Sequence, residues 1–334
     1  EPRLLQEKTI GGTAAPTLAS GNLRSIVERT EGWPIALKLA WLSLKRGTDF
    51  DDLLDEFRSP GPELARYLSQ QVLATMPEDT QDLIMRTSIL DRLTGDLVNL
   101  LCDRHDGWLM LERLEEQGAF LTPLDPVRRT YRYHQLFGEH MRERLERCNS
   151  PLYRALHRRA AEWFAARGDI AEAVSHAAQS DDDELLVVIL EDAGGWRLIP
   201  DGEQPAVERG LVKLPAATVD ARPRLVLTRV YLEIKRGELA TARADFDQLL
   251  AKLGGQEVSA DVWTDVRMME DVLADYENEP CSLDDLLARE ALLRTLPTND
   301  HFVLADFGGT LAAHYYEGGW LERAMEPALT AGEH

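Results

Sequence analysis

Apolar residues recur three or four positions apart through the first part of the chain, from about residue 64 to residue 117. Leu97, Val98 and Leu101 form one such group, and Thr94 stands just before it with a side chain that suits a helix N-terminus. A period near 3.6 residues places apolar side chains on one face of a helix. The pattern therefore predicts a series of amphipathic helices.

The pattern changes after about residue 118. Residues 119–124 have the composition of a strand, residues 125–126 are typical of a turn, and residues 130–133 are typical of a returning strand. A further helix is predicted from about His134. Several helices followed by a hairpin and one more helix predict a winged-helix unit.

After about residue 150 the strand signals stop and a short phrase recurs. In it a glycine ends one predicted helix and an alanine follows five residues later on the next (Gly168 and Ala173, Gly237 and Ala242, Gly319 and Ala324). Glycine permits a tight turn between antiparallel helices, and alanine lets the second helix pack closely. The glycines are 69 and 82 residues apart, near two repeats of about 34 residues with an insertion.

These intervals predict a mostly α chain in which a winged-helix unit precedes a TPR-like α-solenoid. Residues 194–215 and 256–282 would hold degenerate helix pairs. An unrelated helical bundle is the alternative.

The N-terminal part gives a further helix signal. Pro34 suits the first turn of a helix over residues 35–45, and that helix is apolar on nearly every side. Such a helix is expected to be buried. A linker is predicted at Ser59-Pro-Gly-Pro62.

Composition narrows the function classes. The chain has 37 basic and 58 acidic residues, a net charge of −21, which disfavours nucleic-acid binding over a broad face. Its three cysteines are far apart, so we expect no disulfide framework and a cytoplasmic location. No apolar run is long enough to span a membrane, so no membrane partner is expected.

One segment is basic in this acidic chain. The segment from Arg128 to Arg159 contains nine arginines and three glutamates, which gives a local charge of +6. This basic island could meet a nucleotide phosphate or an acidic face of the same protein. The alternative is an ordinary helix surface with ion pairs one turn apart, such as Glu143 with Arg147.

Few residues suggest catalysis or metal binding. The sequence lacks the glycine-rich P-loop with its phosphate-binding lysine. His134 and His140 are six residues apart, a spacing that does not share a helix face, so no metal site is expected. The acidic pairs near residues 181–184 and 284–285 suit helix N-termini. We therefore expect no enzyme activity from this chain.

Five motifs occur in order along the chain: Thr30-Glu-Gly-Trp-Pro34-Ile-Ala-Leu37, Arg86-Thr-Ser-Ile-Leu90, Gly118-Ala-Phe-Leu121, Tyr131-Arg-Tyr-His-Gln-Leu-Phe137, and Leu156-His-Arg-Arg-Ala160 with Trp163-Phe164. Together they resemble the MalT-like group of large ATP-binding LuxR-family transcriptional regulators, which are STAND (signal-transducing) NTPases. The resemblance runs from about residue 20 to residue 250.

That resemblance implies four parts in order: a P-loop nucleotide-binding domain, a winged helix, a helical-repeat sensor and a C-terminal helix-turn-helix. The chain matches the middle of this order. Residues 1–58 correspond to the helical tail of the nucleotide-binding module, residues 59–148 to the winged helix, and residues 149–334 to the sensor.

The resemblance also implies a nucleotide site. Gly32, Trp33 and Pro34 match the GxP motif, whose proline lies by the adenine, and His134 matches the histidine that reaches the β-phosphate in the ADP-bound off state. Gln135 departs from the carboxylate found at this position in plant and animal relatives. For His134 the alternative is a capping or packed histidine at the corner between strand and helix.

We therefore expect the regulatory and sensor portion of an ATP-dependent transcriptional regulator. ATP or ADP would be shared with a P-loop domain, and the full protein could hydrolyse ATP slowly as a switch; the isolated chain is expected to carry no cofactor. An inducer or inhibitory protein would bind the repeats, activation would bring self-association, and DNA would be bound only through a C-terminal domain. The alternatives are a stand-alone TPR-like scaffold that binds a protein or peptide, and a hydrolase with an unrecognised site.

Overall fold

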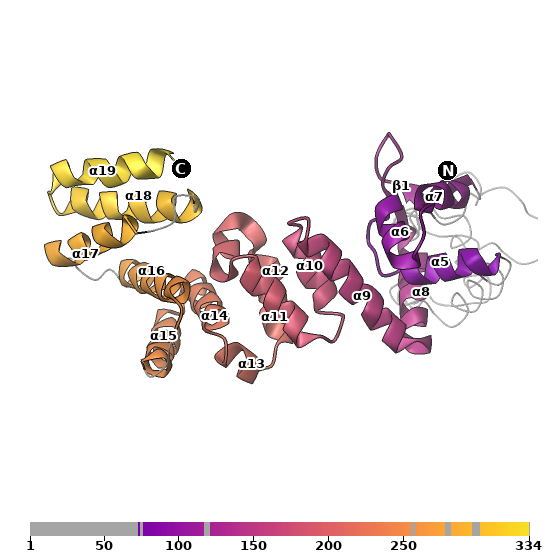
Figure 1. Cartoon of the computed structure of the whole chain (residues 1–334), viewed down its shortest axis with the longest axis horizontal. Helices are drawn as coiled ribbons and strands as arrows, with labels where there is room; N and C mark the ends of the chain where they lie inside the picture. The colour runs from indigo at the N-terminus through magenta and orange to yellow at the C-terminus, as the bar shows by residue number, and fades with distance from the viewer. Residues whose placement is uncertain are drawn as a thin grey trace, which may run out of the picture. The chain divides into compact units, whose positions relative to one another are not determined.

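The computed structural model describes residues 73, 76–116, 121–254, 258–277, 282–295 and 301–333. The predicted helix over residues 35–45 and the predicted linker at residues 59–62 lie outside them. The chain divides into two compact units, Glu1–Asp182 and Asp183–His334, and each is described by itself (Figure 1). None of the helices among the described residues is long and apolar enough to cross a membrane.

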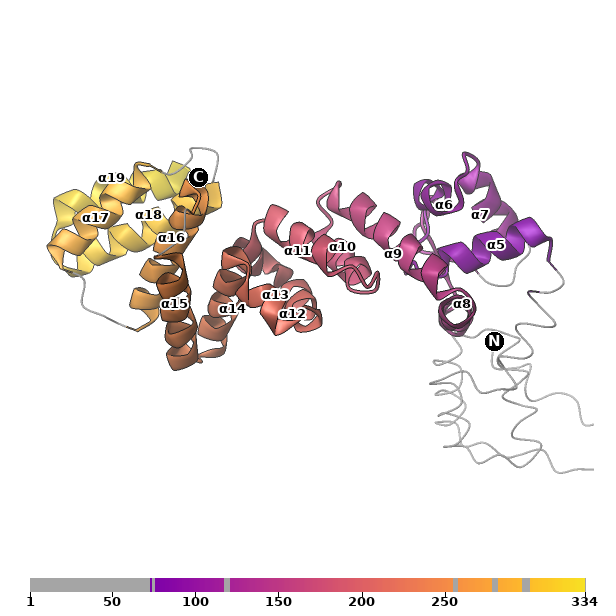
Figure 2. The same ribbon diagram turned by 60° about the horizontal axis from the view of Figure 1, so that its bottom comes forward.

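The first unit contains six helices and a two-stranded sheet among its described residues (Figures 1 and 2). In chain order these are α5 (Glu78–Thr87), α6 (Gly95–Cys102), α7 (Gly107–Glu116), β1 (Leu121–Pro123), β2 (Tyr131–Tyr133), α8 (Gln135–Cys148), α9 (Ser150–Ala165) and α10 (Ile170–Ala177). Three helices, a hairpin and a fourth helix make the predicted winged helix, and α9 with α10 is the first helical hairpin.

The hairpin forms where the sequence places it. Strands β1 and β2 are antiparallel, with Leu121 opposite Tyr133. Leu93 adds a single bridge to Tyr131 on the other side of β2. At the turn, the Asp125 carboxylate accepts hydrogen bonds from the backbone N–H groups of Arg129 and Thr130, which holds the loop closed.

The ends of α6 and the start of α9 show how far local sequence signals determine the helix caps. The Thr94 side chain accepts a hydrogen bond from Leu97 N at 3.3 Å, so the predicted cap of α6 is confirmed. Asp103 ends the same helix with left-handed backbone angles, φ 53° and ψ 47°. Asn149 caps α9 by accepting from Leu152 N, and Pro151 follows in the first turn.

The second unit is helical throughout its described residues. Its elements are α11 (Asp183–Asp192), the short turns η4 (Gly195–Leu198) and η5 (Ile199–Glu203), α12 (Gln204–Lys213), α13 (Ala216–Asp220), α14 (Pro223–Arg236), α15 (Leu239–Leu253), α16 (Ala260–Tyr276), α17 (Leu283–Leu293), α18 (His301–Glu317) and α19 (Leu321–Glu333). Successive antiparallel helices give the TPR-like solenoid expected from the sequence (Figure 2).

The three predicted glycine turns all join antiparallel helices. Gly168, Gly237 and Gly319 have φ values of 77°, 78° and 86°, a region that residues with a Cβ atom rarely adopt. Ala173 and Ala242 are fully buried on the helices that follow. The sequence pattern therefore predicted these two hairpins and also the close packing of their helices at the two alanines.

The third hairpin packs differently. Ala324 is only half-buried, and α18 and α19 pack tightly at Gly308. A Cβ atom there would lie 3.0 Å from Pro327 O. The close packing predicted at Ala324 is thus wrong for this pair, because the small residue that admits the partner helix is on α18.

The predicted degenerate helix pairs are also wrong where the structure describes them. Residues 194–215 hold irregular turns and one regular helix, α12, because Gly194, Gly195 and Gly202 all adopt positive φ and interrupt the first turn of helix. Residues 258–277 hold a single helix, α16.

Candidate functional site

The candidate site predicted from the sequence centres on the corner between β2 and α8. Gly32, Trp33 and Pro34 lie outside the described residues. His134 is the residue before α8, half-buried, with φ −53° and ψ 134°. Its side chain makes no capping hydrogen bond to α8, so the alternative of a helix-capping histidine is wrong, while its carbonyl accepts from Gly138 N at 2.9 Å.

Two buried tyrosines fix this corner. The Tyr131 hydroxyl donates to Glu115 Oε2 at 3.0 Å, and burial raises the pKa of Tyr131 to about 12. The Tyr133 hydroxyl lies 2.7 Å from Thr87 Oγ1 in the core. Burial raises the pKa of Tyr133 as well. Both rings are therefore held as neutral phenols, and their contacts fix the strand that leads into His134.

The start of α8 suits an anion. The first turn carries no acidic residue, and the unpaired N–H groups at a helix N-terminus attract negative charge. Gln135 donates its side-chain N–H to Glu139 Oε1 at 3.0 Å. The Gln135 side chain is therefore hydrogen-bonded within α8.

The basic island is largely neutralised by acidic groups of the same unit. Arg147 pairs with Glu143 at 3.0 Å, as the helix-surface interpretation predicted. Other arginines reach acidic side chains elsewhere in the first unit: Arg128 with Glu115, Arg142 with Asp91, Arg154 with Asp181, Arg158 with Asp182, and Arg159 with Asp103. The prediction that the basic island meets acidic groups of the same protein is thus confirmed for these arginines.

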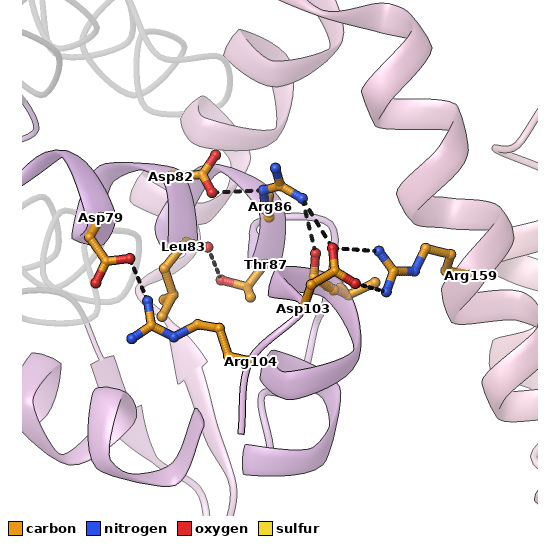
Figure 3. A network of polar contacts seen from close by, with 9 residues as sticks. Asp79, Asp82, Leu83, Arg86, Thr87, Asp103, Arg104 and Arg159 are labelled. Atoms are coloured by element: carbon orange, nitrogen blue, oxygen red, sulfur yellow. Dashed lines mark hydrogen bonds and ion pairs between the residues drawn. The ribbon is translucent and has the colours of Figure 1, made fainter. Parts of the chain in front are cut away.

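The Arg159 pair connects the first helical hairpin to the winged helix (Figure 3). From α9 its guanidinium donates to both carboxylate oxygens of Asp103, at 2.6 and 3.2 Å, and to the carbonyl oxygen of Leu100. The hydrogen bond from Arg159 lowers the pKa of Asp103. Arg86 approaches the same carboxylate at 3.9 Å and also pairs with Asp82 at 2.8 Å. The cation therefore sits at the C-terminus of α6, where the helix dipole favours positive charge.

Beneath these ion pairs, α9 shares the apolar core of the winged helix. One cluster of buried side chains joins the turn after α5 and helix α6 with α8 and α9: Ile89, Leu90, Leu97, Leu101, Leu145, Tyr153, Leu156 and Ala160. Separating α9 from the winged helix would expose this core to water, which is costly at about 25 cal/mol for each Å². The first helical hairpin and the winged helix therefore behave as one body.

A pair of buried histidines joins α9 to α10. His157 and His176 are 4% and 5% exposed, and their Nδ1 atoms lie 2.9 Å apart. Phe164 stacks on His176, with ring centroids 5.4 Å apart. Burial lowers the pKa of His157 to about 3 and that of His176 to about 4. Sequence reasoning did not single out this pair, because the partners are on different helices and nothing in their spacing relates them.

Comparison with known proteins bears on this architecture. Residues 69–153 match the family described as MalT winged helix domain. The serine/threonine-protein kinase PknK of Mycobacterium tuberculosis is 32% identical over 287 residues, which cover 84% of this chain and 26% of that protein. The HTH-type transcriptional regulator MalT of Vibrio parahaemolyticus is 29% identical over 217 residues, 64% of this chain and 23% of MalT.

The chain thus spans about a quarter of the length of the curated relatives it matches. Among solved structures, a STAND protein with a tetratricopeptide repeat sensor from Pyrococcus horikoshii matches with a TM-score of 0.46 and 13% identity, over 93% of this chain and 54% of that one.

The fold of the chain is that of a winged helix joined to a TPR-like solenoid. Residues 69–153 match the MalT winged helix domain family, and the chain is similar to MalT over 64% of its length, as the resemblance of its motifs predicted. The predicted domain boundaries at residues 58 and 148 stay predictions; by packing, α9 and α10 group with the winged helix.

Proposed function

We propose that this chain is the regulatory and sensor part of a MalT-like signal-transducing protein. The observation that carries the proposal is the core shared by the winged helix and α9. A change in the helical repeats that displaced α9 would disturb the winged helix directly, because the two have no separate cores. This arrangement lets a ligand on one part bias the state of the other.

In this proposal the winged helix completes a nucleotide site. ADP or ATP would be held mainly by a P-loop domain that this chain does not contain, with Gly32, Trp33 and Pro34 near the base. His134 would donate an imidazole N–H to a phosphate oxygen at the start of α8, where the helix dipole also favours an anion. ADP would favour a closed state, and ATP with an inducer an open, self-associating one.

The partners follow from the same proposal. An inducer or an inhibitory protein would bind the helical repeats, and any contact with DNA would be made by a separate C-terminal domain. The chain would have no catalytic activity of its own and would work in the cytoplasm.

The similarity to PknK favours a second candidate for the activity that this chain regulates, a kinase activity. One similar protein is named as a kinase and the others as transcriptional regulators, and the kinase matches the larger part of this chain. A segment shared by a kinase and by transcriptional regulators is expected to regulate the rest of the protein, whatever activity the rest of the protein has. The chain would then regulate a kinase domain by the same coupling, and a phosphoryl-transfer assay on the longer protein distinguishes the two.

His134→Ala tests the nucleotide step, in protein that includes the P-loop domain. A lost hydrogen bond to a charged phosphate costs about 1.5–3 kcal/mol, so ADP affinity measured by calorimetry is expected to fall at least about tenfold. Output without inducer is expected to rise. His105→Ala is the control, because His105 is exposed on the same unit. Unchanged ADP affinity in His134→Ala would rule out this role for His134.

A further inference from the structure

The junction of α16, α17 and α18 in the second unit contains four ionisable side chains in contact. Asp271 and Asp275 lie one turn apart on α16, Arg289 lies on α17 and His314 lies on α18. Arg289 is 8% exposed and pairs through Nε with Asp271 Oδ1 and through Nη1 with Asp275 Oδ1, both at 3.0 Å. His314 Nε2 lies 2.7 Å from the same Asp275 oxygen. This polar cluster therefore joins three helices.

The charges of the cluster do not balance. Two carboxylates face one guanidinium, so the four side chains carry one negative charge in excess when His314 is neutral and both carboxyl groups are ionised. Glu270, an exposed residue of α16, adds a further negative charge near Asp271. An excess charge that is largely removed from water is unfavourable. One bound proton would neutralise the cluster.

The bonds within the cluster indicate which carboxyl group takes that proton. Asp275 Oδ1 is in contact with both Arg289 and His314, and donors of this kind favour the ionised form of a carboxyl group. Asp271 is paired with Arg289, a cation that it shares with Asp275. Of the two carboxyl groups, Asp271 is therefore the less stabilised as an anion and protonates first.

The proton can reach Asp271 in the folded chain. A hollow at the same junction is lined by Asp271 and Asp275 together with Met268 on α16 and Phe307 and Leu311 on α18. It opens to solvent and has room for one water-sized group. Exchange of a proton with water therefore does not require the helices to separate.

We propose that this cluster is a proton-operated latch, in which a proton on Asp271 removes the excess charge and holds α17 and α18 against α16, and loss of the proton loosens the junction. The latch would make the last helices of the second unit sensitive to pH. It is a property of this unit alone and holds whether or not the chain contributes to a nucleotide site.

The pKa of Asp271 agrees with this assignment. Burial, together with the nearby Asp275 and Glu270, raises that pKa from its usual value near 3.8 to about 7, although Arg289 and His314 act in the opposite direction. A carboxyl group with a raised pKa binds its proton more tightly when the junction is closed. The closed state is therefore favoured at low pH and loses stability as the pH rises towards 7, by up to about tenfold for each pH unit.

Hydrogen exchange of the α17 and α18 amides in the full chain tests the latch at pH 5.5, 6.5 and 7.5, after correction for the intrinsic effect of pH on exchange. Protection is expected to fall at least about tenfold between pH 5.5 and pH 7.5. Asp271→Asn has the shape of the protonated carboxyl group and carries no charge, so it should lose most of this fall and be better protected than the wild type at pH 7.5. Glu270→Gln removes an exposed charge from the same helix and is the matched control, which should keep the fall.

Protection of the wild-type junction that does not change with pH would overturn the proposal. So would an Asp271→Asn variant that keeps the wild-type fall, or one that is less protected than the wild type at pH 7.5. A second measurement needs no variant: the carbon-13 NMR shift of the Asp271 carboxyl group is expected to titrate near pH 7. A midpoint below pH 5 would reject Asp271 as the site of the proton.

Discussion

Burial keeps His157 and His176 neutral in the folded chain. Their Nδ1 contact of 2.9 Å needs one nitrogen to donate and the other to accept, so protonation of both rings would place two N–H groups against each other. Their pKa values, about 3 and about 4, lie below the usual histidine value near 6.5. The unfolded chain therefore binds more protons than the folded chain between about pH 4 and pH 6.5, and folding stability falls as the pH falls through that range.

A pH series on the double variant His157→Leu/His176→Leu tests this linkage. Each histidine is expected to contribute a slope of up to about 1.4 kcal/mol per pH unit to the free energy of unfolding of the first unit. The variant should lose most of the slope between pH 5 and pH 6.5 in urea titrations. His105→Ala removes an exposed histidine and should keep it. A slope that the double variant shares with the wild type contradicts the linkage.

At the scale of elements, the crossing of α6 and α7 depends on a single glycine. A Cβ atom at Gly107 would lie 2.5 Å from Gly95 O and 2.8 Å from Asn99 Oδ1. The Gly107 N–H also donates to Asn99 Oδ1 at 2.8 Å. The two helices are therefore so close that only a residue without a side chain fits, and backbone atoms cannot move aside as a flexible side chain can.

Gly107→Ala is expected to lower the free energy of unfolding of the first unit by about 1–3 kcal/mol, the usual cost of overpacking. Chemical denaturation measures the change. Gly309→Ala is the control on another helix, because its nearest neighbour to an added Cβ is Ala331 Cβ at an ordinary 4.0 Å. That variant should be neutral or slightly stabilising, since alanine has the higher helix propensity. Equal losses from the two substitutions would argue against the crowding at Gly107.

For the whole molecule, the two units should respond to pH in opposite directions. In the second unit burial raises the pKa of Glu233 and of Asp271 to about 7. A carboxyl group with a raised pKa binds more protons in the folded state, so its unit becomes more stable as the pH falls from about 7 to about 4.5. The histidine pair of the first unit has the reverse sign.

Calorimetric unfolding of the full chain at pH 5.5 and pH 7 tests this difference. Because each unit has its own core, two transitions are expected. On acidification the midpoint of the first unit should fall and that of the second should rise. Glu233→Gln should reduce the rise without moving the other transition, and His157→Leu/His176→Leu identifies the first unit's transition. Two midpoints that shift together would show that these groups do not dominate the response.

Much of the architecture could be predicted because it depends on local signals. Helical period, the Thr94 cap and the turn glycines act through neighbouring residues, so they are visible in the sequence and confirmed by the structure. The packing at Ala324 and the predicted helix pair over residues 194–215 were wrong. In the first case the small residue is Gly308, on a partner helix that no local pattern relates to Ala324. In the second, glycines with positive φ turned a predicted helix into irregular turns.

For the candidate site, too, part could be predicted from the sequence and part could not. The sequence by itself determined the corner of Tyr131 to Phe137, the MalT-like character of the chain and the existence of a basic island. Only the tertiary structure decided where that basic charge goes, because Arg159 and Asp103 are 56 residues apart and a long-range ion pair leaves no periodic trace. The same holds for the contact of His157 with His176, because these residues come from separate helices that meet only when the chain folds.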